Sequence, residues 1–405
     1  MIPAVLSREP VVVDRDIVCV GFNDWETEVW TNQHHLMARL AAHNRVLFVE
    51  SLGLRRPTLA ARDVRRIARR LGLGLRGAGR LRATSVDGGV LNVVSPLVVP
   101  AHASALARRV NAFVLPRQIG RAAAELGITE PILWAYVPQA ELLLDRLAPG
   151  LVVYHCVDDI AAHPRIDTAA FRTAERRFAR RADIVLASSV PLAERMCRLN
   201  PNVHLMTNVA DVDLFATARL PGPIDPAVAA LPEPRIVFTG AIAATKVDIP
   251  LLIELATLRP DWSIVLAGPV GLGDPQTDAS VLASIGNVHL IGSRPYAHLP
   301  AVLRGAQAAT IPYLINELTT GIFPMKVYEY LAAGLPVVAT PLPSLQGIDG
   351  ISFAAGAGPF AAELERLMAE DGPGPRAARS RLAEGQSWEA RLQAIARLIE
   401  DHHPR

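Results

Sequence analysis

Short hydrophobic runs alternate along the chain with longer amphipathic segments. Residues 16–22 (DIVCVGF) predict a buried strand that ends at Gly21, residues 32–43 (NQHHLMARLAAH) a helix, and residues 45–51 (RVLFVES) a second strand. Strand, helix and strand in this order indicate a βαβ unit with a parallel sheet. Because ligands bind outside the carboxyl ends of such strands, we expect Gly21 to Glu28, with Asn23 among them, to line a cleft.

The alternation continues to about residue 209 and then stops at a proline-rich stretch. Further strands are predicted at VLNVVSP, PILWAYVP, LVVYHCVDD, ADIVLASS and NVHLMTNV, with helices between them at 103–126, 139–147, 167–181 and 191–199. Residues 220–234 then contain five prolines in fifteen residues, which is typical of an interdomain linker.

The same pattern restarts after the linker. Strands are predicted at RIVFTG, WSIVLAGP, NVHLIG, AATIPY and PVVAT, and the final helix, 388–402, is long enough to reach back across the linker. We therefore predict an α/β protein of two doubly wound, Rossmann-like domains that face each other across a cleft. The predicted boundaries are 1–215 for the first domain, 216–234 for the linker, 235–385 for the second domain, and 386–405 for the crossover helix and tail.

Composition agrees with this organisation and excludes some functions. Of 405 residues, half are hydrophobic and a fifth are charged, and the net charge of +2 does not indicate nucleic-acid binding. The three cysteines are far apart without ligand spacing, so we interpret them as reduced core residues of a cytoplasmic protein. We recognise neither a signal peptide nor an apolar run of about 18 residues that would span a membrane.

Residues 54–82 differ from the rest, because they hold ten arginines against one aspartate. Val64, Ile67, Ala68 and Leu71 recur there at helical spacing, which suits a basic amphipathic helix on an anionic membrane surface. A solvated helix over the first core, or a partly disordered excursion, is the alternative. The GxGxxG at 72–77 follows this segment rather than a strand, so we do not expect it to bind a dinucleotide.

Lysine is almost absent. Of 41 basic residues 39 are arginine, and the two lysines are Lys246 and Lys326. Either their survival is chance, or these positions need a compact ammonium instead of a planar guanidinium. Lys326 lies in the segment 316–340, where a polar loop leads into a helix that also carries Glu329. A helix start is a ready anion site, so we expect a diphosphate there and on Lys326, with ribose hydroxyls on Glu329.

Four strand ends of the second half carry loops of one kind. These loops are 240–246, which ends at Lys246, then Gly268-Pro269, 292–295, and 317–326, which ends at Lys326. Glycine at the end of a strand lets a ligand approach the backbone closely. Two lysines from separate loops could then hold a diphosphate from both sides.

The first domain offers fewer candidates. Asp158-Asp159 ends a predicted strand and could contact acceptor hydroxyls or act as a base, or the pair could cap a helix. His155 precedes this pair and is more readily explained as structural, and of His34 and His35 only one can face the cleft. No histidine or cysteine has a second ligand at metal-site spacing, so we expect no metal.

Several of these segments resemble the donor domain of GT-B glycosyltransferases of the family 4 type. The similar segments are TGAIAATKVDIPLLIELA, LAGP, NVHLIGSRPYAHLPAVL, PYLINELTTGIFPMKVYEYLAAGLPVVAT and, before the linker, NVADVDLF. The resemblance implies that Lys246 and Lys326 bind the donor diphosphate near Gly240 and Gly268, that Glu329 holds the ribose, and that Ser293, Arg294 and Tyr296 lie at the base. It also implies retention at the anomeric carbon without a metal.

The chain departs from the family pattern at the sugar end of the site. The first glutamate of the E-x7-E motif should fall at 321, which is Gly321, and Glu317 is out of register. The candidates for the donor sugar are therefore Glu317, Thr319, Thr320 and Gly321. The arginine that precedes the first lysine in the family is also missing, since residues 241–245 are AIAAT.

These observations predict a glycosyltransferase, of hexosyltransferase type, that uses a UDP or GDP sugar and no further cofactor. Lys246 and Lys326 would stabilise the departing diphosphate, and Asp158 would contact the acceptor together with Gly21, Asn23 and His155. The Arg-rich segment favours a glycan or lipid-linked acceptor at the inner membrane face, as in envelope polysaccharide assembly. A soluble metabolite as acceptor, a GT-B sugar-nucleotide epimerase and a non-catalytic nucleotide-sugar-binding protein are the alternatives.

Overall fold

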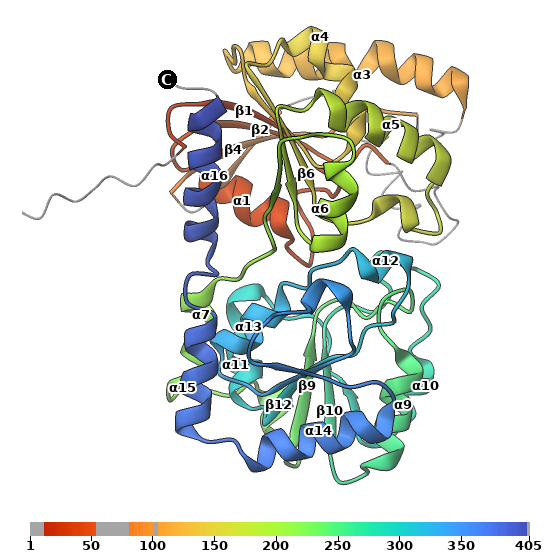
Figure 1. Ribbon diagram of the computed structural model, residues 1–405, viewed down its shortest axis with the longest axis vertical. Coiled ribbons are helices and arrows are strands. Elements are labelled where there is room, and N and C mark those ends of the chain that lie inside the picture. The colour runs from red at the N-terminus through yellow and green to blue at the C-terminus, as the bar shows by residue number, and fades with distance from the viewer. Residues whose placement is uncertain (1–11, 54–80, 87, 100–103, 403–405) are drawn as a thin grey trace, which may run out of the picture.

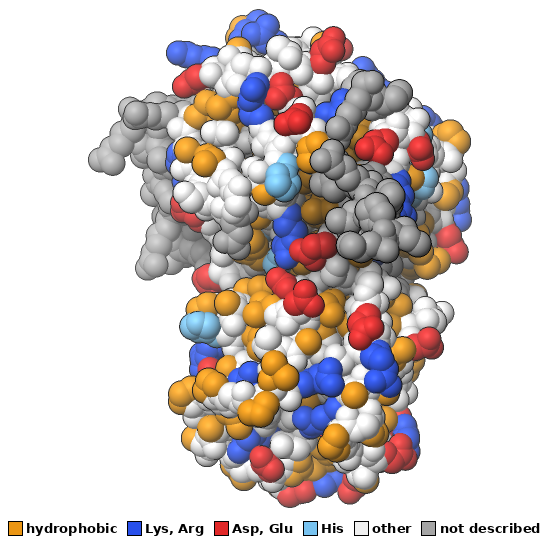
Figure 2. Space-filling view, turned by 90° about the vertical axis from the view of Figure 1, so that its left-hand side faces the viewer, with side chains coloured by type: hydrophobic (Ala, Val, Ile, Leu, Met, Phe, Trp, Pro, Cys, Tyr) orange, Lys and Arg blue, Asp and Glu red, His pale blue; other side chains and the backbone are white. Residues whose placement is uncertain are grey.

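The computed structural model describes residues 12–53, 81–86, 88–99 and 104–402. Two lobes, each built on a twisted sheet with helices on both faces, are joined end to end (Figure 1), and the outline narrows between them in the side view (Figure 2). The predicted basic helix of 54–82 and the GxGxxG at 72–77 lie outside the described residues, except that Leu81 and Arg82 begin a strand.

The first domain holds an eight-stranded sheet in the order β3-β4-β2-β1-β5-β6-β7-β8. Its strands are β1 (Asp16–Val20), β2 (Arg45–Val49), β3 (Leu81–Val86), β4 (Gly89–Val94), β5 (Ile132–Ala135), β6 (Leu151–Cys156), β7 (Ile184–Ala187) and β8 (Val203–Leu205). All neighbours are parallel except the β3–β4 hairpin at the edge. The central strands are buried along nearly their whole length, as apolar strands covered on both faces must be.

Helices cover both faces of this sheet. They are α1 (Asn32–Leu40), α3 (Ala105–Glu125), η1 (Pro138–Leu143), α4 (Leu144–Leu147), η2 (Ile160–Ala162), α5 (Thr168–Arg181) and α6 (Val190–Cys197). One core contains α3, α4, α5 and α6 side chains, and the opposite core contains α1 side chains. The short segments α7 (Val212–Ala216), η3 (Thr217–Arg219) and α8 (Pro226–Ala229) lead through the proline-rich linker.

The second domain holds a six-stranded sheet, in the order β11-β10-β9-β12-β13-β14, with every pair parallel. The elements are β9 (Arg235–Thr239), α9 (Ile249–Leu258), β10 (Ser263–Ala267), α10 (Ser280–Ala283), β11 (Val288–Leu290), η4 (Tyr296–His298), α11 (Leu299–Arg304), β12 (Ala308–Ile311), α12 (Glu317–Thr320), α13 (Lys326–Ala332), β13 (Val337–Ala339), η5 (Pro343–Leu345), β14 (Ile351–Phe353), α14 (Ala357–Ala369) and α15 (Pro373–Leu382).

The final helix, α16 (Trp388–His402), crosses back to the first domain as predicted. Trp388, Ile395 and Ile399 are buried in the first-domain core against α1, and Arg39 of α1 bonds Glu389 at 2.8 Å. This return ties the two lobes together at a second point beside the linker. Among the described helices, none combines the length and apolarity that a bilayer crossing needs.

Candidate functional site

Two glycines bring backbone to the cleft side of the second domain. Gly240 follows β9 with φ +120°, and Gly268 follows β10 with φ +159°, conformations that other residues rarely adopt. A Cβ at Gly268 would lie 1.9 Å from the Gly240 carbonyl oxygen. Neither turn could therefore keep its shape with a side chain at position 268, and the two strand ends lie in close contact.

Lys326, at the start of α13, lies over this turn. Its ammonium is 3.4 Å from the position that a Cβ at Gly240 would take, and it donates to the Tyr313 hydroxyl at 2.8 Å. It also lies 5.0 Å from the ring centroids of Phe238 and Tyr313, a cation–π arrangement. Within the part of the chain that the structure describes, no carboxylate forms an ion pair with this lysine.

The Lys246 loop is fastened to the same strand end. Val247 forms an antiparallel bridge with Tyr313, and the Lys246 carbonyl accepts from the Leu314 amide at 2.8 Å. The side-chain amide of Asn316 donates to the Thr245 carbonyl at 3.1 Å. Both lysine-bearing loops thus contact the segment 313–316, and Tyr313 joins them. Sequence reasoning missed Tyr313, because a lone tyrosine after a strand carries no motif.

Glu329 lies one helical turn after Lys326 and is buried. Burial raises the pKa of its carboxyl group to about 7, while the charge of Lys326 and the neighbouring Tyr296 hydroxyl act in the lowering direction. The group therefore changes protonation near neutral pH. Either form can bond a ribose hydroxyl, as an acceptor when ionised and also as a donor when protonated.

The residues predicted at the nucleotide base are held by other parts of the protein. Arg294 forms a two-pronged ion pair with Asp225 of the linker, at 2.6 and 3.2 Å, so its guanidinium is engaged there. Ser293 donates to Glu28 of the first domain at 3.2 Å. Tyr296 packs on Phe215 and on His35, with ring centroids 5.3 and 4.8 Å apart. The side chains of this loop therefore contact the first domain and the linker. The backbone of the loop is the part that is predicted to contact a nucleotide base.

The predicted donor-sugar residues form a compact turn around α12. The buried Thr319 hydroxyl donates to the Leu314 carbonyl and accepts from the Asn316 amide in a reciprocal cap, and Thr320 donates to the Asn316 carbonyl at 2.7 Å. Glu317 is exposed in the first turn of α12. A Cβ at Gly321 would lie 3.2 Å from the Asp159 Cβ atom, so this glycine permits a contact between the domains.

The first-domain candidates are mostly part of the scaffold. A side chain at Gly21 would collide with the Phe48 ring at 2.7 Å, and the Asn23 carbonyl accepts from Gln33 at 3.4 Å. His155 is buried against the Tyr136 ring, with centroids 5.0 Å apart, and burial lowers its pKa to about 3. His155 is thus neutral and enclosed, which agrees with its structural interpretation.

The two aspartates after β6, Asp158 and Asp159, lie on the loop that leads into η2. Asp159 occupies the N-cap position of η2, but its carboxylate bonds Arg172 at 2.6 Å instead of the helix amides. Asp158 is half-buried on the same loop, which packs beside α12 of the second domain. Asp158 stays the residue of the pair that is predicted to contact the acceptor.

A buried polar relay, which sequence reasoning missed, connects the first domain to the Lys326 loop. The Tyr136 hydroxyl donates to Asn32 at 2.9 Å, Asn32 donates to Asn208 at 2.8 Å, and Asn208 donates to the Phe323 carbonyl at 2.8 Å. Phe323 lies three residues before Lys326. Asn208 opens the NVADVDLF segment, and that was the one available signal for the relay.

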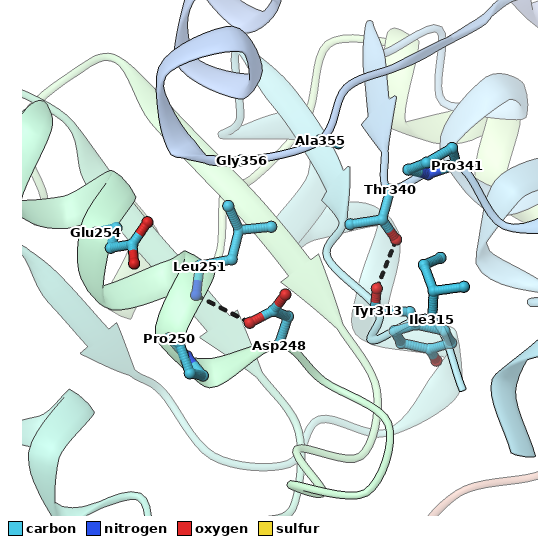
Figure 3. A pocket seen from close by; sticks show the side chains of 10 residues that line it. All are labelled: Asp248, Pro250, Leu251, Glu254, Tyr313, Ile315, Thr340, Pro341, Ala355 and Gly356. Carbon is cyan, nitrogen blue, oxygen red and sulfur yellow. Dashed lines mark hydrogen bonds between the residues drawn. The ribbon is translucent and has the colours of Figure 1, made fainter. Parts of the chain in front are cut away.

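A pocket of about 280 Å³, which Tyr313 also lines, lies between the start of α9 and the ends of β12 and β13 (Figure 3). Asp248 and Glu254 line it, with Asp248 accepting from the Leu251 amide at 3.0 Å. Thr340 donates to the Tyr313 carbonyl at 2.6 Å. Because two carboxylates repel a diphosphate, this pocket does not suit the anion that Lys326 is predicted to bind.

The described residues gather no group of three or more histidine, cysteine, aspartate or glutamate side chains that could hold a metal ion. At these strand ends the described residues bring the ammonium of Lys326 close to the backbone of the Gly240 turn. An arrangement of this kind binds and stabilises a phosphate-bearing group.

Comparisons with known proteins identify the family of the second domain and the fold of the chain. Residues 233–370 match the family model for Glycosyl transferases group 1. The chain is also 26% identical over 281 residues, 65% of this chain and 70% of the relative, to the putative teichuronic acid biosynthesis glycosyltransferase TuaH of Bacillus subtilis (strain 168). The range 233–370 that matches the family model contains both lysines, Glu329 and the glycine turn.

Solved structures with the same fold span the whole chain. Sucrose-phosphate synthase from Thermosynechococcus elongatus superposes with a TM-score of 0.66 at 17% identity, over 96% of this chain and 98% of that one. Anabaena HepE, in complex with UDP and glucose, gives 0.62 at 14% identity, over 95% and 99%. At these identities the likeness establishes the fold. Residues 233–370 thus form a Glycosyl transferases group 1 domain, and the chain that carries them is a glycosyltransferase of the GT-B fold.

Proposed function

We propose that this protein transfers a sugar from a nucleoside diphosphate to a hydroxyl of a glycan or lipid-linked acceptor in the assembly of an envelope polysaccharide. The observation that carries the proposal is the position of Lys326, an ammonium without a paired carboxylate among the described residues, over the Gly240–Gly268 turn. A partly buried cation with no ion-pair partner among the described residues favours an anionic ligand. The backbone turn beside it leaves room for phosphate oxygens.

The reaction we propose breaks the bond between the anomeric carbon and the diphosphate oxygen and forms one to the acceptor oxygen. The electron pair leaves with the diphosphate, where Lys326 and Lys246 stabilise the growing negative charge. Asp158, on the loop beside α12, would take the acceptor proton. We further propose retention at the anomeric carbon without a metal ion, as the family resemblance implies.

We propose UDP as the nucleotide, because HepE, which shares the fold, binds UDP and glucose. The acceptor class rests on TuaH, whose name places it in teichuronic acid biosynthesis. An acceptor of that kind would bring this protein to the cytoplasmic face of a membrane as a peripheral protein. The donor sugar is the least constrained part of the proposal, since the Thr319 and Thr320 hydroxyls are engaged within their own turn.

Titration calorimetry with UDP and with GDP tests the proposal. We expect UDP to bind and Lys326→Ala to weaken its affinity by about a hundredfold, the effect of losing one charge-assisted contact to a phosphate. Lys246→Ala should weaken it less, and Arg381→Ala, which changes an exposed cation on α15, should leave it unchanged. Unchanged UDP affinity in a folded Lys326→Ala variant would refute the site. Binding without transfer over a broad acceptor panel would instead favour a nucleotide-sugar-binding protein.

A further inference from the structure

The helix α3 exposes an apolar stripe on its outer face. Leu106, Val110 and Phe113 are 71%, 39% and 59% exposed and follow one another at helical spacing. The opposite face, with Leu115 and Ile119, is buried in the first-domain core. Three large apolar side chains in a row on a surface helix are more than the scattered exposure that folded proteins usually show.

Positive charge surrounds this stripe. Arg109, Arg117 and Arg121 are exposed along the same helix, and the first acidic residue of α3 is Glu125, at its far end. The Arg117 guanidinium lies 3.5 Å from the Phe113 ring centroid. A basic side chain thus lies directly beside the apolar stripe. Arg146 of α4 lies across Gly120, where an added Cβ would meet its side chain.

We propose that α3 docks the protein on an anionic lipid surface, through Leu106, Val110 and Phe113 in the interface and the arginines on lipid phosphates. Apolar side chains flanked by arginines are the composition that binds such surfaces, since long basic side chains reach the headgroups while their stems stay apolar. A second copy of this helix is a less suitable partner, because arginines would then face arginines. The segment 54–82, with its ten arginines, is a less suitable partner for the same reason.

The position of α3 suits this role. The helix runs along the outer side of the first domain, away from the second domain (Figure 1), so docking there leaves the cleft uncovered. The inference rests on the proposed function in one respect, the choice of a membrane as the partner. A lipid-linked acceptor would be held in a membrane. Membrane docking and UDP binding use different surfaces, and the two can therefore be tested separately.

Co-sedimentation of the full chain with phosphatidylcholine vesicles, with and without phosphatidylglycerol, tests the inference. We expect binding to the anionic vesicles only. The change R109Q/R117Q/R121Q should lower the partition coefficient on the order of a hundredfold, since each basic residue near an anionic surface contributes about fivefold. L106S/V110S/F113S should lower it by at least about tenfold. Phe113→Leu should keep most of the binding, whereas Phe113→Asp should lose it.

Matched controls use exposed residues elsewhere. L220S/L258S/V281S removes three exposed apolar side chains, R198Q/R381Q/R397Q removes three exposed arginines, and both should bind vesicles like the wild type. Circular dichroism and UDP affinity, measured on every variant, should match the wild type. The inference would be overturned if the wild-type protein did not bind anionic vesicles, or if the α3 variants bound them as well as the control variants do. It would also be overturned by α3-dependent binding to duplex DNA without vesicle binding, which would identify another polyanion as the partner.

Discussion

The two domains present edges of different kinds to the cleft. In the second domain, Gly240 and Gly268 bring bare backbone forward, and Lys326 lies above them. In the first domain, Gly21 is packed by Phe48, and the carboxylate of Asp159 is bonded to Arg172. In these positions the second domain brings a charge close to bare backbone, whereas the first packs its glycine and pairs its carboxylate within its own scaffold. Residues 233–370, which match the family model, contain Gly240, Gly268 and Lys326.

Burial shifts the pKa of three histidines in the first domain and of one glutamate in the second, in opposite directions. In the first, burial lowers the pKa of His34 to about 4 and those of His35 and His155 to about 3, while in the second it raises the pKa of Glu329 to about 7. The histidines lower stability as the pH falls below about 6.5, because the unfolded chain takes up their protons first. Glu329 lowers stability as the pH rises from about 4.5 to 7, because the unfolded chain releases its proton first.

The largest effect is expected for Gly268→Ala. The new methyl group would lie 1.9 Å from the Gly240 carbonyl oxygen, on a backbone with φ +159°, so the two strand ends must separate. We expect a loss of more than about 4 kcal/mol in the free energy of unfolding, measured by urea denaturation, and a loss of UDP binding. Gly286→Ala is the control, because nothing lies within 4 Å of its Cβ position. Equal stability of the two variants would contradict the close contact.

Glu329→Gln should change the pH dependence of stability. The variant cannot ionise, so its stability relative to the wild type should increase between pH 5 and pH 8 by about 3 kcal/mol, the free energy of a pKa shift from 4.5 to about 7. The histidines contribute equally to both proteins and cancel in the difference. Urea denaturation at several pH values measures it. A difference that stays constant across this range would show that Glu329 is not buried as described.

Much of the fold could be predicted from the sequence, because buried parallel strands are short apolar runs between amphipathic helices. β3 was missed because Leu81 and Arg82 had been assigned to the arginine-rich segment, although Arg82 pairs with Glu50 at 3.0 Å. β14 was missed because its three residues, ISF, stand between glycine-containing turns without further apolar neighbours of a strand. The exact residues at which each domain begins and ends remain a prediction.

The candidate site, which stays a prediction, was suggested by a scarce residue type. Only two lysines occur, and both lie on loops that contact Tyr313. Partners that are distant in sequence could not be foreseen: Arg294 is engaged by Asp225, 69 residues away, and Asn208 is bonded to Asn32 at a separation of 176 residues. Arginine, threonine and asparagine can each serve a ligand or the scaffold, and only the folded neighbours decide between these roles.

Asn208→Ala should weaken both stability and donor binding. It leaves the Phe323 carbonyl and the Asn32 amide without their partner, which should cost about 2 kcal/mol in the free energy of unfolding. Because Phe323 precedes Lys326 on the same loop, we also expect UDP affinity to fall several-fold. Asn111→Ala is the matched control: Asn111 is equally buried and bonds the Val99 backbone twice, far from the lysine loops. If both variants lose stability but neither loses UDP affinity, the relay is only structural.

The smallest effect is expected for Thr319→Val, which separates scaffold from ligand contact in the turn around α12. Valine keeps the volume of threonine but removes the hydroxyl that completes the cap with Asn316. The loss of such a cap should lower the free energy of unfolding by about 1 kcal/mol. Since the hydroxyl is buried and already bonded, the KM for the sugar nucleotide should stay within twofold of the wild-type value.

A role of Thr319 in holding the donor sugar would give the opposite result, a KM raised about tenfold with little change in stability. Glu317→Gln provides the comparison, because Glu317 is exposed on the same turn and its carboxylate stands in the first turn of α12. If Glu317→Gln raises the KM and Thr319→Val does not, the sugar is held from the exposed side of the turn. The second domain would then separate its functions within five residues, with the buried hydroxyl shaping the loop and the exposed carboxylate facing the ligand.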